Sequence, residues 1–194
     1  MKNLFFIGIL FAIISLEIYA SEQEPDLIIY NGKEYEIGVY PMETYFKIYP
    51  DKRPENTGTS SALNRGYRAK YEIINNEIIL MDIEIEIFDI DLVNQIFNIY
   101  WQSALEKNIG NRIKVNTFTG KINLFNGKET GVYIGFTPIY EYYKILEIEN
   151  GYFITEYDEN CYEYLQSLIQ SSQNESYEQN YYIKILEELN KIKK

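Results

Sequence analysis

The sequence contains no histidine and only one cysteine among its 194 residues. The lack of histidine excludes Ser-His-Asp and Cys-His catalysis, histidine-ligated zinc and histidine-based pH switching. A single cysteine cannot form an internal disulfide, so the stability of the fold must come from packing. We interpret Cys161 as a small apolar residue on a buried helix face. The chemistry that remains is that of carboxylates, lysine, tyrosine and oxygen-ligated metals.

Positive charge is also scarce. Eighteen lysine and arginine residues face twenty-nine aspartate and glutamate residues, which gives a net charge of −11. This excess repels phosphate backbones and anionic lipid surfaces, so we expect no nucleic-acid partner. Basic proteins, polycations and divalent metals remain compatible. The run that starts at Asp89 is not an EF-hand loop, because it has Asn94 and Tyr100 where such a loop needs Gly and Glu. We expect no cofactor and no metal site.

A long hydrophobic run occurs at the start of the chain. Lys2 precedes an apolar segment over residues 4–14, and Ile-Tyr-Ala at 18–20 predicts cleavage between Ala20 and Ser21. The run is shorter than the roughly 20 residues that cross a bilayer. We predict a signal peptide over 1–20 and a soluble product over 21–194 that is periplasmic or secreted. A lipoprotein would need a cysteine next to the cleavage site, so we expect no stable membrane anchoring after signal cleavage.

Turn signals and alternation predict two hairpins. Asn31-Gly32 separates β-prone runs over 26–40, and Asn75-Asn76 does the same over 64–87. In the second hairpin, alternate apolar residues are expected on one strand face and acidic residues on the other. The apolar set is Ile79, Met81, Ile83, Ile85 and Ile87, and the acidic set is Asp82, Glu84 and Glu86. A short helix is predicted over 42–49.

Helical spacing of apolar residues predicts a central helix over 89–107, capped by Asp89 or Asp91. Five strands are expected to follow as a meander, at 112–118, 121–125, 131–137, 141–149 and 152–157. Two amphipathic helices are predicted in the C-terminal part, about 158–194. The sequence therefore predicts a single α+β domain, with a largely antiparallel sheet, one central helix and two C-terminal helices.

Arg65, Tyr67 and Arg68 form the candidate ligand-binding site. They lie in the main basic concentration of an acidic chain, and a guanidinium group binds a carboxylate or a phosphate in bidentate fashion. An acidic ligand is one interpretation. The alternative is internal charge pairing, in which Arg65 or Arg68 faces Glu72 or Glu84 across the hairpin.

The acidic face of Asp82, Glu84 and Glu86 has its carboxylates about 7 Å apart by strand geometry. A glycosidase pair needs roughly 5–10 Å, so this spacing permits a carboxylate-based hydrolase. Calcium or a basic partner is also compatible with it. We favour a solvated strand face, because polar residues must alternate along any half-buried strand.

Tyrosine is abundant, at 20 residues. Aromatic faces stack on sugar rings and anchor protein interfaces at low entropy cost. The sets expected to matter are the Tyr140, Tyr142 and Tyr143 cluster and the N-terminal series Tyr30, Tyr35, Tyr40, Tyr45 and Tyr49. The alternative is that tyrosine serves as a general strand and core residue.

Several stretches together resemble a group of small exported bacterial proteins of unknown function. They are DLIIYNGKEY at 26–35, PMETYF at 41–46, PDKRP at 50–54, SSALNRGY at 60–67 and TFTG at 117–120. This resemblance implies an exported domain with a tyrosine-rich N-terminal hairpin and an Arg-Gly-Tyr strand. It carries no assigned activity and therefore supplies no catalytic residue.

These observations lead to one main functional hypothesis. We expect an exported binding or interaction module without enzymatic activity, whose partner is a protein or a glycan. One alternative is a carboxylate-based glycan hydrolase, which needs two acids of different pKa in one cleft. Another is an acidic inhibitor or immunity-type protein for a basic partner, whose association would be sensitive to salt.

Overall fold

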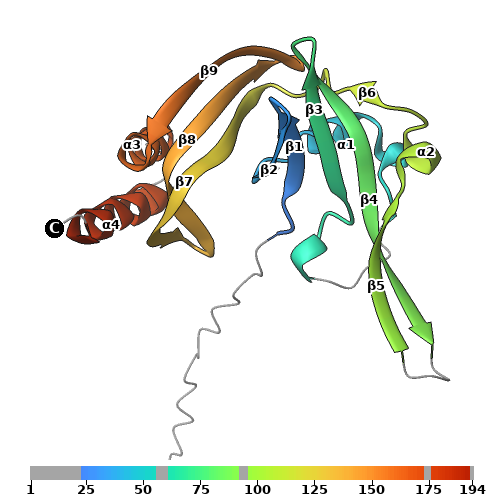
Figure 1. The fold of residues 1–194 in the computed structure, drawn as a ribbon, viewed down its shortest axis with the longest axis horizontal. Helices are drawn as coiled ribbons and strands as arrows, with labels where there is room; N and C mark the ends of the chain where they lie inside the picture. Colours follow the sequence, from blue (N-terminus) through green and yellow to red (C-terminus); the bar gives the residue numbers. More distant parts are fainter. Residues whose placement is uncertain (1–22, 56–60, 92–95, 173–175, 193–194) are drawn as a thin grey trace, which may run out of the picture.

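Figure 1 shows the computed structural model, which describes residues 23–55, 61–91, 96–172 and 176–192. The predicted signal peptide and the cleavage site at Ala20 and Ser21 lie outside these residues. Nine strands form one sheet in the order β2-β1-β3-β4-β9-β8-β7, and β5 and β6 also pair with β4. The β1–β3 pair is parallel and the other pairs are antiparallel.

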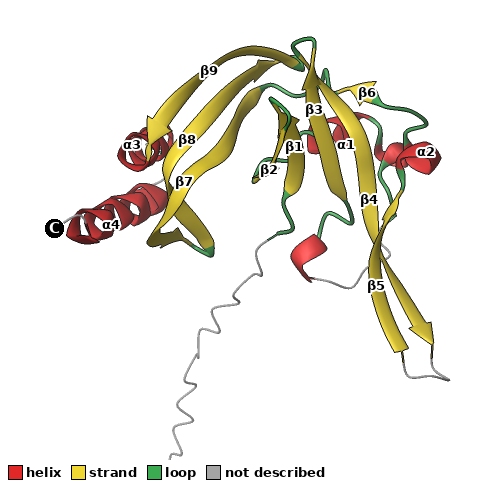
Figure 2. Cartoon of the chain, in the orientation of Figure 1, coloured by secondary structure: helices red, strands yellow, loops and turns green. Residues whose placement is uncertain are grey.

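The strands are β1 (Asp26–Tyr30), β2 (Lys33–Ile37), β3 (Arg68–Ile74), β4 (Glu77–Asp91), β5 (Ile96–Ser103), β6 (Ile113–Lys114), β7 (Gly120–Ile134), β8 (Thr137–Glu149) and β9 (Tyr152–Asn160). The helices are α1 (Met42–Ile48), α2 (Leu105–Asn108), α3 (Cys161–Ser171) and α4 (Ser176–Ile192). Figure 2 shows α3 and α4 together against the β7–β9 end of the sheet. The prediction of a single, largely antiparallel α+β domain with two C-terminal helices is confirmed.

Both predicted hairpins form, and local backbone geometry explains why. Asn31 and Gly32 have φ angles of 51° and 76°, and Asn75 and Asn76 have φ angles of 52° and 63°. A two-residue type I′ turn requires positive φ at both central positions, and Asn and Gly tolerate that conformation best. The turn residues therefore fix the register of β1 with β2 and of β3 with β4.

The expected alternation along β4 is wrong for its first half. The pairing shifts between Lys70 and Tyr71, which face Asp82 and Leu80, so Met81 is an extra residue on β4. A bulge of this kind reverses the face to which the following side chains point. Leu80 is consequently fully buried before the bulge and Ile83 after it, whereas Met81 is only half-buried. Ile79 and Met81 thus do not share the core face with Ile83.

The predicted central helix over 89–107 is also wrong. Strand β4 continues to Asp91, so Asp89 and Asp91 cap no helix, and β5 pairs back along β4 from Asp91↔Ile96 to Glu84↔Ser103. Only the four-residue α2 follows. The run is rich in β-branched and aromatic residues, and the ladder with β4 outweighs its helical spacing. Figure 1 shows β4 and β5 extending together as a hairpin.

Two of the predicted meander strands join into one. The segment at 121–125 and the part of the segment at 131–137 up to Ile134 belong to β7, whose register with β8 shifts on both sides of Glu129. Gly127 has a φ of 83° and lies at an irregularity of the strand instead of a hairpin turn. The chain reverses later, at Gly135, and the first predicted strand shrinks to β6. The two C-terminal helices are confirmed, with Cys161 and Leu165 buried on α3.

Two hydrophobic clusters cover opposite faces of β7 and β8. The first, the N-terminal cluster, joins β1, β3, β4 and α1 to β7 and β8, and includes Leu124 and Leu146. The second, the helical cluster, places Ile145 of β8 against Leu165 of α3 and Ile185 of α4. Leu146 and Ile145 are neighbours in β8, so their side chains point to opposite faces. The strands β7 and β8 are therefore a wall shared by both clusters.

The sheet curves so far that its two edges approach each other. Strands β2 and β7 end the strand order, yet they lie in contact. Within the described residues they share no ladder of backbone hydrogen bonds. We call this line of contact the seam, and it positions the candidate site.

Candidate ligand-binding groove

Two adjoining cavities lie along the seam. The larger has a volume of about 540 Å³ and is lined by residues before β1, the end of β2, Tyr40 and the β7–β8 hairpin. The smaller has a volume of about 280 Å³ and continues towards α3 and α4. Gly38, Phe125, Thr137 and Pro138 line both cavities. We call the two together the seam groove.

One wall of the groove is aromatic, and contacts with neighbouring tyrosines fix the position of its rings. The rings of Phe125 and Tyr140 stack with centroids 5.0 Å apart and an interplanar angle of 8°. The backbone N–H of Tyr140 donates to the hydroxyl of Tyr143 at 3.0 Å. Tyr143 in turn stacks on Tyr164 of α3 at 4.0 Å. These contacts restrict the rings, so a ligand that stacks on Phe125 and Tyr140 meets a preformed surface.

Tyr40 is the aromatic residue of the opposite wall. The guanidinium carbon of Arg65 lies 3.6 Å from the centroid of its ring, which is a cation–π contact. Tyr40 is therefore connected to the buried network described below. Ile37 of β2, which is fully buried, lies beside it along the seam.

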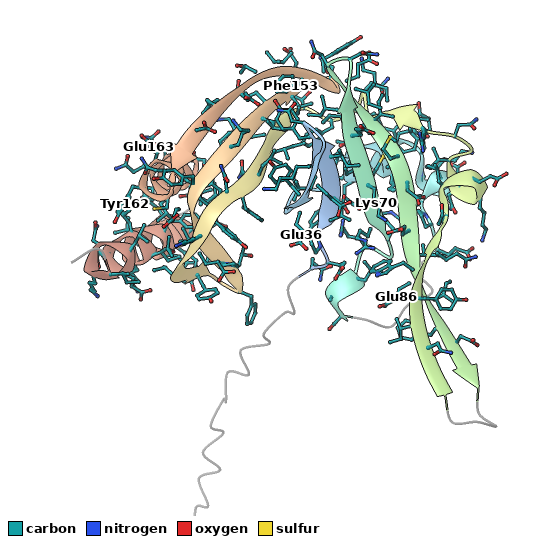
Figure 3. All side chains as sticks on the ribbon, in the orientation of Figure 1. Glu36, Lys70, Glu86, Phe153, Tyr162 and Glu163 are labelled. Atoms are coloured by element: carbon teal, nitrogen blue, oxygen red, sulfur yellow. The ribbon has the colours of Figure 1, made fainter. Side chains whose placement is uncertain are left out.

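In the described part of the chain, the charged residues that line the seam groove are all acidic. They are Glu24, before β1, and Glu36, on β2. The Oε1 atom of Glu24 accepts from Nη1 of Arg68 at 3.3 Å. Glu36 is exposed, and Figure 3 places it at the lower end of the β1–β2 hairpin in that view.

The predicted site residue Arg65 lies behind the groove, in a buried ion pair. Its Nη1 donates to Oδ1 of Asp26 at 2.9 Å, and its Nη2 donates to the carbonyl of Glu24. The side chain of Arg65 is 9% exposed and that of Asp26 is 0% exposed. The sequence interpretation placed a basic residue here but gave no signal that Asp26 would be its partner, because Asp26 comes from the parallel neighbour of β3.

Asp26 is the centre of this buried network. Its Oδ1 also accepts from the backbone N–H of Ala69 at 3.0 Å, and its Oδ2 accepts from the hydroxyl of Tyr71 at 3.0 Å. Burial raises the pKa of Asp26 to about 6, against the opposing effect of Arg65. The network ties the start of β1 to β3, and its side chains are almost fully shielded from solvent.

Tyr67, the second predicted site residue, is fully buried. Its hydroxyl donates to Oε1 of Glu43 at 2.8 Å, and Oε2 of Glu43 pairs with Arg53 at 2.6 Å. Burial raises the pKa of Tyr67. Burial also acts to raise the pKa of Glu43, but hydrogen bonds from Arg53 and Tyr67 leave it lowered. Tyr67 thus joins α1 to β3.

Arg68, the third, pairs across the second hairpin. Its Nη2 and Nε lie 2.8 Å and 3.2 Å from Oε2 of Glu84, and Lys70 binds Oε1 of Glu84 at 2.8 Å. The guanidinium also lies 4.1 Å from the ring centroid of Trp101. The alternative of internal pairing across the hairpin is confirmed for Arg68 and Glu84. An acidic ligand at Arg65, Tyr67 and Arg68 stays a prediction.

The acidic face of β4 is largely occupied by internal contacts. Asp82 accepts a hydrogen bond from the hydroxyl of Ser103 at 2.6 Å. Burial acts to raise the pKa of Glu84, but its basic partners Lys70 and Arg68 leave that pKa lowered. Glu86 is half-buried, and neither Glu84 nor Glu86 lines the seam groove. In the described part of the chain, no group of three or more Cys, Asp or Glu side chains could hold a metal ion.

The tyrosine-rich sets were the useful signal for the groove. Tyr40 and Tyr140 belong to the two sets singled out in the sequence, and both line the seam groove. Phe125, Pro138 and Glu36 were missed. They are far apart in the chain, and only the curvature of the sheet brings them to one place.

Comparison of the chain with known proteins adds no functional residue. Across the described ranges, none of the helices is both long enough and apolar enough to cross a membrane. No family model, curated protein or solved structure matches the chain, so the resemblance to small exported bacterial proteins stays a prediction.

Proposed function

We propose that this chain is an exported binding protein without enzymatic activity, which holds a small organic ligand in the seam groove. The observation that carries the proposal is the pair of adjoining cavities of about 540 Å³ and 280 Å³ with a stacked aromatic wall. Ligand sites are typically clefts of roughly 300–1,000 Å³ lined by aromatic and apolar groups with a few polar ones. The seam groove matches that description.

The aromatic wall supports binding in preference to catalysis. Phe125 and Tyr140 offer flat faces on which the CH face of a sugar ring or an alkyl group can stack. Tyr143 and Tyr164 hold these rings from behind, so little side-chain entropy is lost when a ligand docks. Export is supported by the predicted signal peptide over residues 1–20.

A carboxylate-based hydrolase receives less support. It would need an acid and a base of different pKa in one accessible cleft. Asp26 has a raised pKa, but its side chain is fully buried. Glu84 is held ionised by Arg68 and Lys70. The same internal pairing reduces the negative surface that an acidic inhibitor would offer to a basic enzyme.

A ligand panel in a thermal-shift assay tests the proposal. The purified protein is heated with simple sugars, oligosaccharides and small amines, each in excess. A ligand at about a hundred times its dissociation constant stabilises the fold by roughly 2.7 kcal/mol, which raises the unfolding midpoint. We expect at least one compound to do so.

Two variants locate the site. Tyr140→Ala removes half of the stacked wall and should abolish the shift. Tyr142→Ala, on the same strand, is the matched control, since Tyr142 is 54% exposed and does not line the seam groove. A shift that survives Tyr140→Ala, or a panel without any shift, contradicts the proposal.

A further inference from the structure

We infer that the seam groove selects an organic cation, that is, a ligand with an ammonium or substituted ammonium group on a compact apolar or sugar-like body. This inference rests on the proposed function and names the ligand class of the same groove.

The lining of the groove carries negative charge alone. Among the residues that the structure describes, Glu24 and Glu36 are its charged residues, and no lysine or arginine lines either cavity. An anionic ligand would therefore meet two carboxylates without a compensating cation in the lining. The whole chain has a net charge of −11, which adds a long-range attraction for cations.

Glu36 is the carboxylate best placed to receive the cation. Glu24 shares its charge with Arg68 at 3.3 Å. Glu36 is exposed on the edge strand β2, and within the described residues it forms no ion pair. Its charge is consequently available to a ligand that enters the groove.

The aromatic wall suits the same ligand. The face of an aromatic ring attracts cations through its quadrupole, with a strength of roughly 0.5–2 kcal/mol depending on desolvation. Tyr40 already carries the guanidinium of Arg65 at 3.6 Å, which would repel a second cation. The ammonium group is therefore expected against the stacked pair of Phe125 and Tyr140.

The test compares two molecules that differ in charge and share their shape. Choline and its neutral isostere 3,3-dimethylbutan-1-ol are titrated into the purified protein by calorimetry at low ionic strength. We expect choline to bind at least about tenfold more tightly than the isostere, because only choline gains the cation–π and carboxylate attraction. Equal affinity of the two compounds overturns the inference.

A matched pair of variants locates the charge. Glu36→Gln should weaken choline binding by about fivefold, the scale of one exposed charge interaction. Glu34→Gln also removes one exposed carboxylate from β2, but Glu34 does not line the groove. Its affinity for choline should equal that of the unaltered protein. Equal losses in both variants would mean that only the net charge matters, which contradicts the inference.

The outcomes separate this inference from the proposed function. Binding of a neutral sugar that depends on Tyr140, without binding of choline, leaves the proposed function intact and overturns the organic-cation assignment. Absence of binding by any cation, sugar or neutral isostere overturns both.

Discussion

The side chain of Asp26 connects several parts of the fold, although nothing in the sequence around it predicts this role. It is fully buried, and it binds Arg65, the N–H of Ala69 and the hydroxyl of Tyr71 at once. A buried charge is tolerated only when it is paired and its remaining lone pairs accept hydrogen bonds. All three contacts meet that requirement, and they join the first strand to the third.

Burial raises the pKa of Asp26 from its ordinary value of 3.8 to about 6, and this predicts a pH dependence. Between these values the unfolded chain has lost the proton and the folded chain still holds it. The contribution of Asp26 to the free energy of unfolding therefore falls as pH rises from about 4 to 6, and is then constant. The lowered pKa values of Glu43 and Glu84 act in the opposite direction, since their stabilisation is lost as pH falls.

Urea unfolding of the unaltered protein and of Asp26→Asn at several pH values isolates this effect. The difference in free energy of unfolding, unaltered protein minus variant, should decrease from pH 4 to pH 7. The variant Asp51→Asn corrects for the loss of one charge at an exposed position. A difference that increases with pH would mean that the pairing with Arg65 outweighs the burial of the carboxylate.

At the scale of elements, two glycines in similar turns have different surroundings. Gly32 and Gly151 have φ angles of 76° and 75°, where a residue with a Cβ atom is strained. A Cβ at Gly32 would have open space around it, whereas one at Gly151 would lie 2.5 Å from the carbonyl oxygen of Val115. The N–H of Gly151 also donates to the carbonyl of Phe118 at 2.9 Å.

This difference predicts unequal costs for the same substitution. Gly32→Ala should lower the free energy of unfolding by about 1 kcal/mol, the cost of the left-handed conformation. Gly151→Ala should lower it by about 3 kcal/mol, because the backbone of Val115 must also move. Chemical denaturation of both variants measures the costs. Equal losses would show that the turn at Gly151 relaxes without strain.

The elements also show how local pattern and strand pairing compete. Residues 89–107 have helical spacing of apolar residues, yet most of them form strands. The backbone hydrogen bonds between β4 and β5, where Glu86 pairs with Trp101, stabilise the strands more than the spacing favours a helix. The amphipathic spacing after residue 158, in contrast, does lead to helices. There α3 begins with a capping box, in which Asn160 accepts from the N–H of Glu163 and Glu163 accepts from the N–H of Asn160.

At the scale of the whole molecule, the shared wall of β7 and β8 couples the two hydrophobic clusters. Leu146 belongs to the N-terminal cluster and Ile145 to the helical cluster, although they are adjacent in β8. Loss of one cluster would expose one face of the strands that the other cluster needs. We therefore expect a single cooperative unfolding transition.

Two signals report on the two ends of the molecule. Trp101, the only tryptophan, lies on β5 beside Arg68, and its fluorescence reports on the N-terminal side. Ellipticity at about 222 nm reports mainly on helices, of which α3 and α4 are the longest described. Leu165→Ala, in the helical cluster, should destabilise the fold by about 3 kcal/mol and shift both signals equally. A shift of the ellipticity alone would show that the helices unfold as a separate unit.

Properties that depend on composition and local backbone geometry could be predicted from the amino-acid sequence alone. Without histidine, and with Cys161 as the only cysteine, whole classes of catalysis and the disulfide are excluded whatever the fold. The turns at Asn31 and Asn75 require positive φ, and Asn and Gly provide it locally. The class of fold and the C-terminal helices were predicted correctly because they follow from the local spacing of apolar residues.

Features that depend on contacts between residues far apart in the chain became visible only in the folded protein. The bulge at Met81 depends on the register in which β3 and β4 pair. The ion-pair partner of Arg65 is Asp26, which comes from β1. The seam groove forms because the curvature of the sheet brings Glu36 and Phe125 together. Sequence spacing carries no information about such contacts, since each depends on how separate strands pack against one another.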